Sequence, residues 1–120
     1  MQRLTKAEEE IMQIIWKLGP CTVSQIIDEM DESPKPPHSS VSSLVRLIEK
    51  KGFLSHKAYG KTYEYRPAVL KEDYGKKTLG KFIADYFGGS ANSLVSFLVK
   101  QEEISPEELK ELLDKLKDVD

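Results

Sequence analysis

The chain has 120 residues, 39% hydrophobic and 32% charged, and carries a formal net charge of −2. A chain of this length predicts one domain, or one domain with an appendage, and this composition allows only a modest core. No apolar run approaches the roughly 20 residues that a membrane span needs, and the N-terminus lacks a signal-peptide pattern, so we expect a cytoplasmic protein without membrane insertion.

A first helix is predicted to begin at Thr5. Thr5 and Glu8 form the S/T-x-x-E capping box of a helix start, and Gly19-Pro20 is typical of a helix end. The run Glu8, Glu9 and Glu10 is interpreted as favourable charge at the positive end of the helix dipole, because adjacent side chains diverge on a helix and cannot form a catalytic set. One buried stripe is predicted at i, i+3, i+4 and i+7, consisting of Ile11, Ile14, Ile15 and Leu18.

A second helix follows, and Thr22 with Gln25 fits another capping box. The same spacing predicts its buried stripe, which consists of Val23, Ile26, Ile27 and Met30. The segment 31–37 has three prolines and no apolar periodicity, and it is predicted as a loop. The lone Cys21 cannot form an internal disulfide or a thiolate cluster, and we interpret it as a small apolar filler rather than a sensor.

The stretch from Pro37 to Pro67 is the most informative part of the chain, because it predicts a two-faced helix that runs into a short hairpin. At 100° per residue, one helix face is apolar and comprises Val41, Leu44, Val45 and Ile48. The opposite face carries hydroxyl groups and two cationic side chains and has no carboxylate. Its residues are Ser39, Ser42, Ser43, Arg46 and Lys50. The first face can seat in a core, and the second suits a DNA major groove, whereas an ordinary solvated face mixes both signs of charge.

A β-hairpin is predicted directly after this helix. Gly52 is suited to the left-handed position that ends a helix. Tyr, Thr and Phe are enriched on both sides of Gly60, which is typical of two strands joined by a turn. Lys57 and Lys61 flank this turn, and two lysines so placed can clamp phosphates.

Basic charge concentrates in this part of an otherwise acidic chain. Residues 38–66 hold six Lys/Arg and only two acidic residues, Glu49 and Glu64. Two helices, a loop, an amphipathic helix and a hairpin follow the order of a winged helix-turn-helix domain, in which the third helix enters the major groove and the wing touches the backbone. The DNA contacts predicted on this basis are Ser39, Ser40, Ser42, Ser43, Arg46, Lys50, Lys57, Tyr59 and Lys61.

From Leu70 onward the pattern is purely helical, with breaks at Gly88-Gly89 and before Ser105-Pro106. Three short helices in about 50 residues are a poor core for a monomer, so we expect pairing with a second copy rather than folding back on the N-terminal part. Over residues 100–120 eight Asp/Glu stand against four Lys/Arg, which predicts that this region faces away from DNA. The predicted dimerisation residues are Leu79, Phe82, Ile83, Phe87, Leu94, Leu98, Leu109, Leu112, Leu113 and Leu116.

We therefore predict a mainly α fold with a small β-hairpin wing. A winged helix-turn-helix DNA-binding domain would occupy residues 1–69, and a helical dimerisation region would occupy residues 70–120. A twofold protein of this kind matches a palindromic operator.

Several motifs occur in the order and spacing found in one group of bacterial regulators. They are Ser40 to Val45 followed by Glu49 to Phe53, the hairpin end Tyr63 to Pro67, and Gly88-Gly89 before Asn92 to Val95. Through them nearly the whole chain resembles the BlaI/MecI/CopY type of repressor. The resemblance implies a homodimeric winged-helix repressor that binds an inverted repeat of the TACA/TGTA kind, often at β-lactam-resistance genes. Members commonly have T-V-x-T-L-L-x-R-L in the reading helix, and here Leu47 takes the arginine position while Arg46 precedes it.

The resemblance also implies a route by which repression ends. In β-lactam-responsive members a membrane sensor-protease pathway cuts the dimerisation region a few residues beyond the equivalent of Asn92 to Val95. The Asn-Phe bond typical of that cut is absent here, and the nearest candidates are Ser96-Phe97 and Phe97-Leu98. Copper-responsive members carry Cys-x-Cys pairs near the C-terminus, and residues 107–120 contain no cysteine, so copper sensing is not expected.

The sequence contains no Gly-rich phosphate loop, metal-ligand constellation or catalytic Ser/His/Asp set, so we expect neither an enzyme nor a cofactor or metal site. His38 and His56 are interpreted as surface or groove-facing residues. Two functions stay open, a dimeric transcriptional repressor and a winged-helix module that binds another protein. Aromatic or aliphatic anchors would favour the second, and the polar helix face from Ser39 to Lys50 favours the first.

Overall fold

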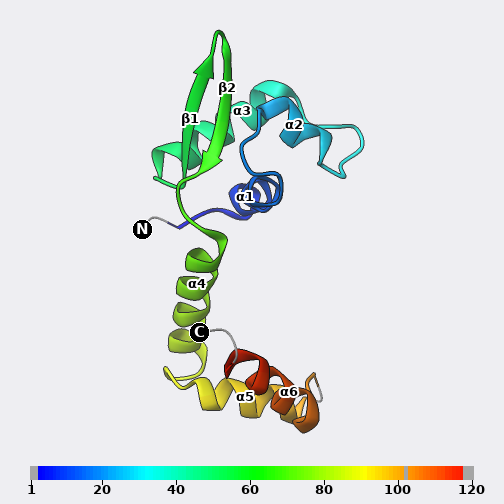
Figure 1. Ribbon diagram of the computed structural model, residues 1–120, viewed down its shortest axis with the longest axis vertical. Helices are drawn as coiled ribbons and strands as arrows, with labels where there is room; N and C mark the ends of the chain where they lie inside the picture. The colour runs from blue at the N-terminus through cyan, green and yellow to red at the C-terminus, as the bar shows by residue number, and fades with distance from the viewer. Residues whose placement is uncertain (1–2, 102, 118–120) are drawn as a thin grey trace. The chain divides into compact units, whose positions relative to one another are not determined.

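The computed structural model of the chain describes residues 3–101 and 103–117 (Figure 1). The chain divides into two compact units, Met1–Tyr74 and Gly75–Asp120. The described elements are six helices and one two-stranded antiparallel sheet. The predicted fold class, mainly α with a β-hairpin wing, is confirmed.

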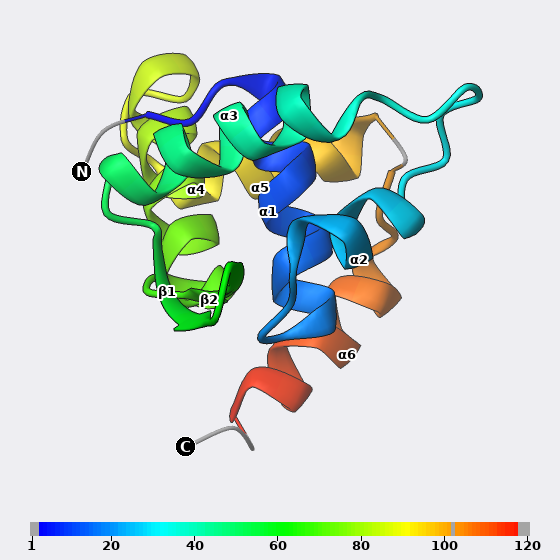
Figure 2. The same cartoon turned by 90° about the horizontal axis from the view of Figure 1, so that it is seen from above.

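Three helices and a hairpin form the body of the first unit, in the predicted order. The elements are α1 (Lys6–Leu18), α2 (Val23–Asp28), α3 (His38–Lys50), β1 (Leu54–Tyr59) and β2 (Thr62–Pro67). The strands pair antiparallel, with Leu54 opposite Pro67 at the base and Tyr59 opposite Thr62 at the tip. α3 packs on both α1 and α2, as the view from above shows (Figure 2).

Short-range hydrogen bonds place the helix starts where the sequence predicts them. The Thr5 N–H donates to Glu8 Oε1 at 2.7 Å, and the Glu8 N–H donates to Thr5 Oγ1 at 3.2 Å. Thr22 and Gln25 form the same reciprocal pair at 2.9 and 3.3 Å. Each box satisfies backbone donors that a helix start leaves free, which stabilises the helix by about 1 kcal/mol.

Glycine sets the two sharp changes of direction around the hairpin. Gly52, with φ of 90°, follows the end of α3, and Gly60, with φ of 64°, occupies the turn between the strands. Residues that carry a Cβ rarely adopt these positive φ values, so glycine is the favoured residue at both positions.

One hydrophobic core holds the first unit together. The predicted stripes of all three helices enter it, either buried or packed against its edge. The backbone of Cys21 pairs with that of Tyr65 in both directions, at 2.9 and 2.7 Å, and ties the wing to the segment before α2. The buried hydrophobic residues are Leu4, Ile11, Met12, Ile15, Cys21, Val23, Ile26, Val41, Val45, Ile48, Phe53, Leu54 and Tyr65.

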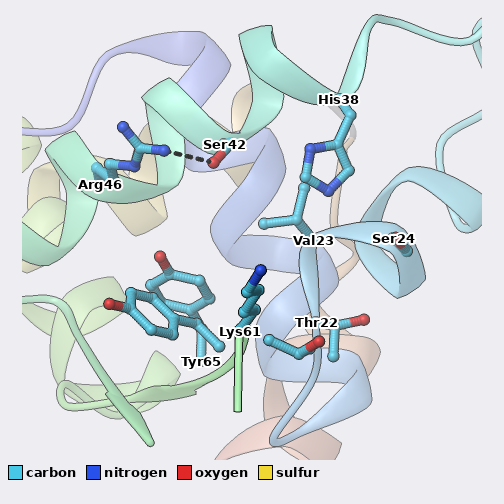
Figure 3. A pocket seen from close by; sticks show the side chains of 10 residues that line it. Thr22, Val23, Ser24, His38, Ser42, Arg46, Lys61 and Tyr65 are labelled. Atoms are coloured by element: carbon cyan, nitrogen blue, oxygen red, sulfur yellow. Dashed lines mark hydrogen bonds between the residues drawn. The ribbon is translucent and has the colours of Figure 1, made fainter. Parts of the chain in front are cut away.

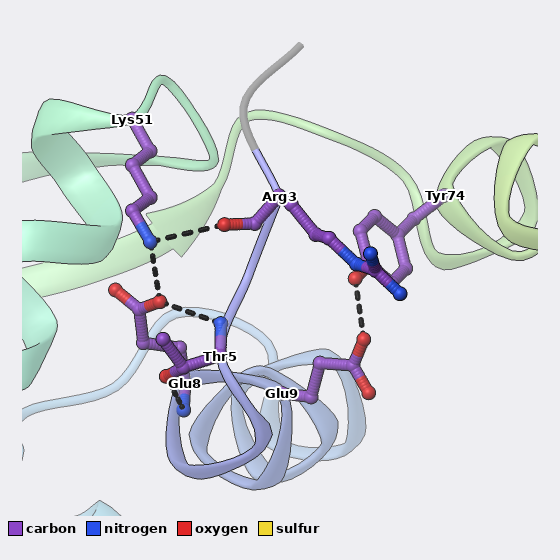
Figure 4. Close-up of polar contacts among 6 residues, drawn as sticks. All are labelled: Arg3, Thr5, Glu8, Glu9, Lys51 and Tyr74. Atoms are coloured by element: carbon purple, nitrogen blue, oxygen red, sulfur yellow. Dashed lines mark hydrogen bonds and ion pairs between the residues drawn. The ribbon is translucent and has the colours of Figure 1, made fainter.

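Glu8 also takes part in a buried ion pair, beyond its predicted place at the start of α1. Its side chain is almost fully buried, and its Oε1 accepts hydrogen bonds from the Thr5 N–H and from Lys51 Nζ, the latter at 2.5 Å (Figure 4). Lys51 Nζ also donates to the Arg3 carbonyl at 3.0 Å. Burial raises the pKa of Glu8, but the hydrogen bonds from Lys51 and Thr5 lower it by more, so the net pKa is below its usual value.

The last residue of the first unit, Tyr74, is held by side chains of that unit. Its ring centroid lies 5.7 Å from that of Trp16 and 5.5 Å from that of Phe53, and its hydroxyl donates to Glu9 Oε1 at 2.5 Å (Figure 4). The Trp16 Nε1–H donates to the Val69 carbonyl at 2.9 Å. The segment after the wing and the first turn of α4 (Lys71–Tyr86) are therefore held against the core as far as Tyr74.

The second unit continues α4 and adds α5 (Ala91–Lys100) and α6 (Pro106–Lys117). Ser90 caps α5 and the Ser105 hydroxyl accepts from the Glu108 N–H at 3.1 Å, as the predicted start of α6 requires. No residue of α4 or α5 is buried. Leu79, Phe82 and Phe97 are about half exposed, whereas Ile83, Phe87, Leu94, Leu98 and Leu109 are partly buried. The side chains of Leu112, Leu113 and Leu116 lie outside the described part of the structure.

We predict that Lys51→Met lowers the free energy of unfolding by about 3 kcal/mol at neutral pH, because it leaves a buried Glu8 carboxylate without its cation. The folded-state pKa of Glu8 is lowered, so its ion pair stabilises the fold above the unfolded-state pKa of about 4.3 and is lost as the pH falls through the lower folded-state value. The deficit of the variant should therefore shrink in acid. Urea unfolding at a series of pH values measures both effects.

The matched control is Lys50→Met, which removes an exposed lysine one residue away. Its free energy of unfolding should stay within about 0.5 kcal/mol of the wild type. Equal losses in both variants, or a Lys51→Met deficit that does not change with pH, would contradict the role assigned to the Glu8–Lys51 pair.

Candidate nucleic-acid interface

The outward face of α3 carries the polar residues predicted for DNA contact. Its exposed members are Ser39, Ser40, Ser43, Arg46 and Lys50, and Ser42 is half-buried. The opposite stripe, Val41, Val45 and Ile48, is buried in the core. The structure thus confirms the two opposed faces, because burial of an apolar stripe determines which side of a helix points outward.

Two side-chain contacts organise this face. The Ser43 hydroxyl donates to the Ser39 carbonyl at 2.9 Å, and Arg46 Nη2 lies 3.4 Å from Ser42 Oγ. The second contact is long for a hydrogen bond and uses only one of the five N–H donors of a guanidinium. Arg46 can therefore bind guanine O6 and N7 bidentately, or a phosphate, without breaking a strong contact.

A pocket of about 430 Å³ lies between α3, the start of α2 and the wing (Figure 3). Its lining includes two permanent cations, an imidazole and several hydroxyls, and none of its ten residues carries a carboxylate. A cavity of this chemistry suits an oxygen-rich anion such as a phosphate group. The lining residues are Thr22, Val23, Ser24, His38, Ser42, Arg46, Lys61, Thr62, Tyr63 and Tyr65.

The pocket brings together only part of the predicted set. Ser42, Arg46 and Lys61 line it, whereas Lys57 and Tyr59 contact each other on the wing, with Lys57 Nζ 5.4 Å from the Tyr59 ring centroid. The predicted set missed the hydroxyls at the start of α2, on Thr22 and Ser24. His38, interpreted from the sequence as a surface or groove-facing residue, is exposed and lines the pocket. The capping box at Thr22 marked the start of α2, but periodicity alone does not show that this start lies beside the reading helix.

The single carboxylate of α3, on Glu49, is paired with the wing. Glu49 Oε2 lies 2.5 Å from His56 Nδ1, and the His56 ring stacks on Tyr63 with centroids 4.3 Å apart and planes 15° apart. This contact occupies the Glu49 carboxylate beside the basic face. His56 is therefore a link between α3 and both strands of the wing, a contact that the sequence interpretation did not include.

Cys21 has the environment of an inert thiol. It is buried in the core, and burial, followed by the nearby charge of Glu64, raises its pKa to about 11. A thiol with this pKa is hardly ionised at neutral pH, which supports its interpretation as an apolar filler. Among the residues that the structure describes, no three His, Cys, Asp or Glu side chains gather as metal ligands.

Three helices, a hairpin wing and a cationic, hydroxyl-rich face on the third helix define a winged-helix DNA-binding protein. The family model described as "Penicillinase repressor" matches residues 4–118. The chain belongs to this family of repressors, as its motifs predicted. Transcriptional repressors are not an enzyme class. None of the helices that the structure describes is long and apolar enough to span a membrane.

Named relatives cover most of the chain. It is 32% identical to the penicillinase repressor of Bacillus licheniformis over 111 residues, which is 92% of this chain and 86% of that protein. It is 34% identical to the methicillin resistance regulatory protein MecI of Staphylococcus aureus over 113 residues, 91% and 89% of the two chains.

Solved structures agree with the fold. The solution structure of monomeric B. licheniformis BlaI in complex with the blaP half-operator has a TM-score of 0.50 and 25% identity, and the match covers 61% of this chain and 89% of that one. A MarR family protein from Bacillus stearothermophilus, with a TM-score of 0.51 and 17% identity, covers 98% of this chain and 74% of that one and shares the fold alone.

We predict that Arg46→Ala and Lys61→Ala affect DNA binding differently. Arg46→Ala should lower discrimination at one base pair per half-site by about 1–3 kcal/mol, whereas Lys61→Ala should weaken binding to all sequences alike and reduce the salt slope by about one per contact. Titrations of cognate and random duplexes at several salt concentrations separate the two effects. The control is Lys17→Ala, which removes the same charge at a lysine engaged with Glu29. Equal loss on cognate and random DNA for Arg46→Ala would assign Arg46 to a phosphate.

Proposed function

We propose that this protein represses transcription as a homodimer on an inverted-repeat operator, with β-lactam-resistance-type genes as its targets. Each protomer would place α3 in the major groove of one half-site and its wing on the adjacent backbone. Such a repressor acts on chromosomal DNA and therefore in the cytoplasm. Its partners would be the palindromic duplex and a second copy of the chain.

The observation that carries this proposal is the pocket between α3, α2 and the wing. It concentrates Arg46, Lys61 and His38 with six side-chain hydroxyl groups, in a chain whose net charge is −2. A phosphate seated there would receive charge-assisted hydrogen bonds from Lys61, while Arg46 and the exposed serines of α3 would meet the base edges.

The second unit supports the homodimer. α4 and α5 bury none of their residues, and Leu79 and Phe82 remain 50% and 46% exposed. The Phe87 ring contacts those of Phe82 and Phe97, with centroids 5.8 and 5.7 Å away. Contiguous exposed apolar surface of this kind marks an interaction site, and a second copy would bury it symmetrically.

Inactivation by a sensor-protease pathway stays a prediction from the family resemblance. Both candidate bonds, Ser96-Phe97 and Phe97-Leu98, lie inside α5. Proteases bind extended backbone, so α5 would have to open locally before a cut. Cleavage there would detach α6 from α4 and remove apolar surface from the proposed dimer.

The test of the proposed function is a binding-site selection from random duplexes with the full-length protein. We expect an inverted repeat to be selected. If each protomer neutralises about three to four phosphates, the slope of log K against log salt should be about −5 to −7. A selection that yields no duplex, or binding that does not respond to salt, would reject the repressor function.

Removal of the second unit tests the dimer. A fragment ending at Tyr74 keeps the contacts of Tyr74 with Trp16, Phe53 and Glu9, so it should fold. We expect a monomer that binds a half-operator like the full chain but binds the full operator about 100-fold more weakly, because the linked second half-site no longer adds its effective concentration. Sedimentation and titration measure these properties. A dimeric fragment would place the interface in the first unit.

A further inference from the structure

Leu47 is an exposed leucine on the polar side of α3. Its side chain is 50% exposed. Leu44, on the same helix, packs against the core, whereas Leu47 does not. Leu47 lies one helical turn after Ser43 and one turn before Lys50, both of which are exposed. Leu47 thus interrupts a surface that otherwise consists of hydroxyls and cations.

The chemistry of this side chain restricts what it can contact in a major groove. Leucine has no hydrogen-bonding group, so placing it against a donor or acceptor of a base edge removes water from that group without replacing the hydrogen bond. The thymine 5-methyl group is the apolar feature that distinguishes one base edge in the major groove. A leucine that enters the groove between Ser43 and Lys50 is therefore complementary to thymine.

We propose that Leu47 is a specificity-determining residue that contacts the methyl group of one thymine in each half-site. This inference rests on the proposed function of α3 as the reading helix. It adds an apolar contact to a helix face whose other side chains would form hydrogen bonds with DNA. It also makes recognition depend on a group that can be deleted from DNA without changing the pattern of hydrogen-bond donors and acceptors.

The experiment uses the full-length protein and the duplex obtained by binding-site selection. Each thymine of one half-site is replaced in turn by deoxyuridine, which lacks only the 5-methyl group. One replacement should weaken binding of the wild type about fourfold, the equivalent of about 0.8 kcal/mol for one buried methyl or methylene group. The same replacement should have almost no effect on Leu47→Ala. Alanine is the best helix former and the site is exposed, so this variant should fold normally.

Leu70→Ala is the matched control, because Leu70 is also an exposed leucine of the first unit but lies outside α3. It should keep the full fourfold deoxyuridine effect. Two results would overturn the inference: a wild type that is insensitive at every thymine, or a Leu47→Ala variant that keeps the full penalty. In both cases the protein still binds its selected operator, so the proposed function stands. If no duplex is selected at all, the proposed function and this inference fail together.

Discussion

The structure of the first unit depends on the burial of one stripe of α3 against α1 and α2. Val41, Val45 and Ile48 are almost completely buried, and each such side chain contributes roughly 1.5–3 kcal/mol by leaving water. A rotation of α3 about its axis would expose this stripe and bury serines and Arg46 without partners. Packing on one side of the helix therefore determines which residues the other side offers to DNA.

The carboxylates of α3 and of the wing are engaged by neighbouring side chains. Glu49 contacts His56, and Glu64 Oε1 accepts a hydrogen bond from Arg66 Nη2 at 3.0 Å. The ten residues that line the pocket contain no carboxylate. An acidic chain can thus present a local positive potential, since near a surface the closest charges dominate and distant ones are screened within about 10 Å at 0.1 M salt.

The two units place their apolar residues differently. The first unit buries a complete core, whereas the described residues of α4 and α5 leave Leu79, Phe82 and Phe97 about half exposed. Fewer than 50 residues rarely bury enough surface to be stable alone, so association is a physical route to stability for such a segment. If a second copy covers this surface, the same interface that forms the dimer also sets the distance between its two reading helices.

The sequence by itself determined the order of the elements, the capping boxes at Thr5 and Thr22, and the two faces of α3. These features depend on residues within one or two turns of one another, so spacing along the chain is enough to reveal them. Only the tertiary structure decided the long-range contacts: the Glu8–Lys51 pair across 43 residues, the Cys21–Tyr65 bridge, and the meeting of Ser24 with Lys61 around one pocket. Such contacts join segments whose distance in the folded chain does not follow from their distance in sequence, because it is set by how the helices pack around the common core.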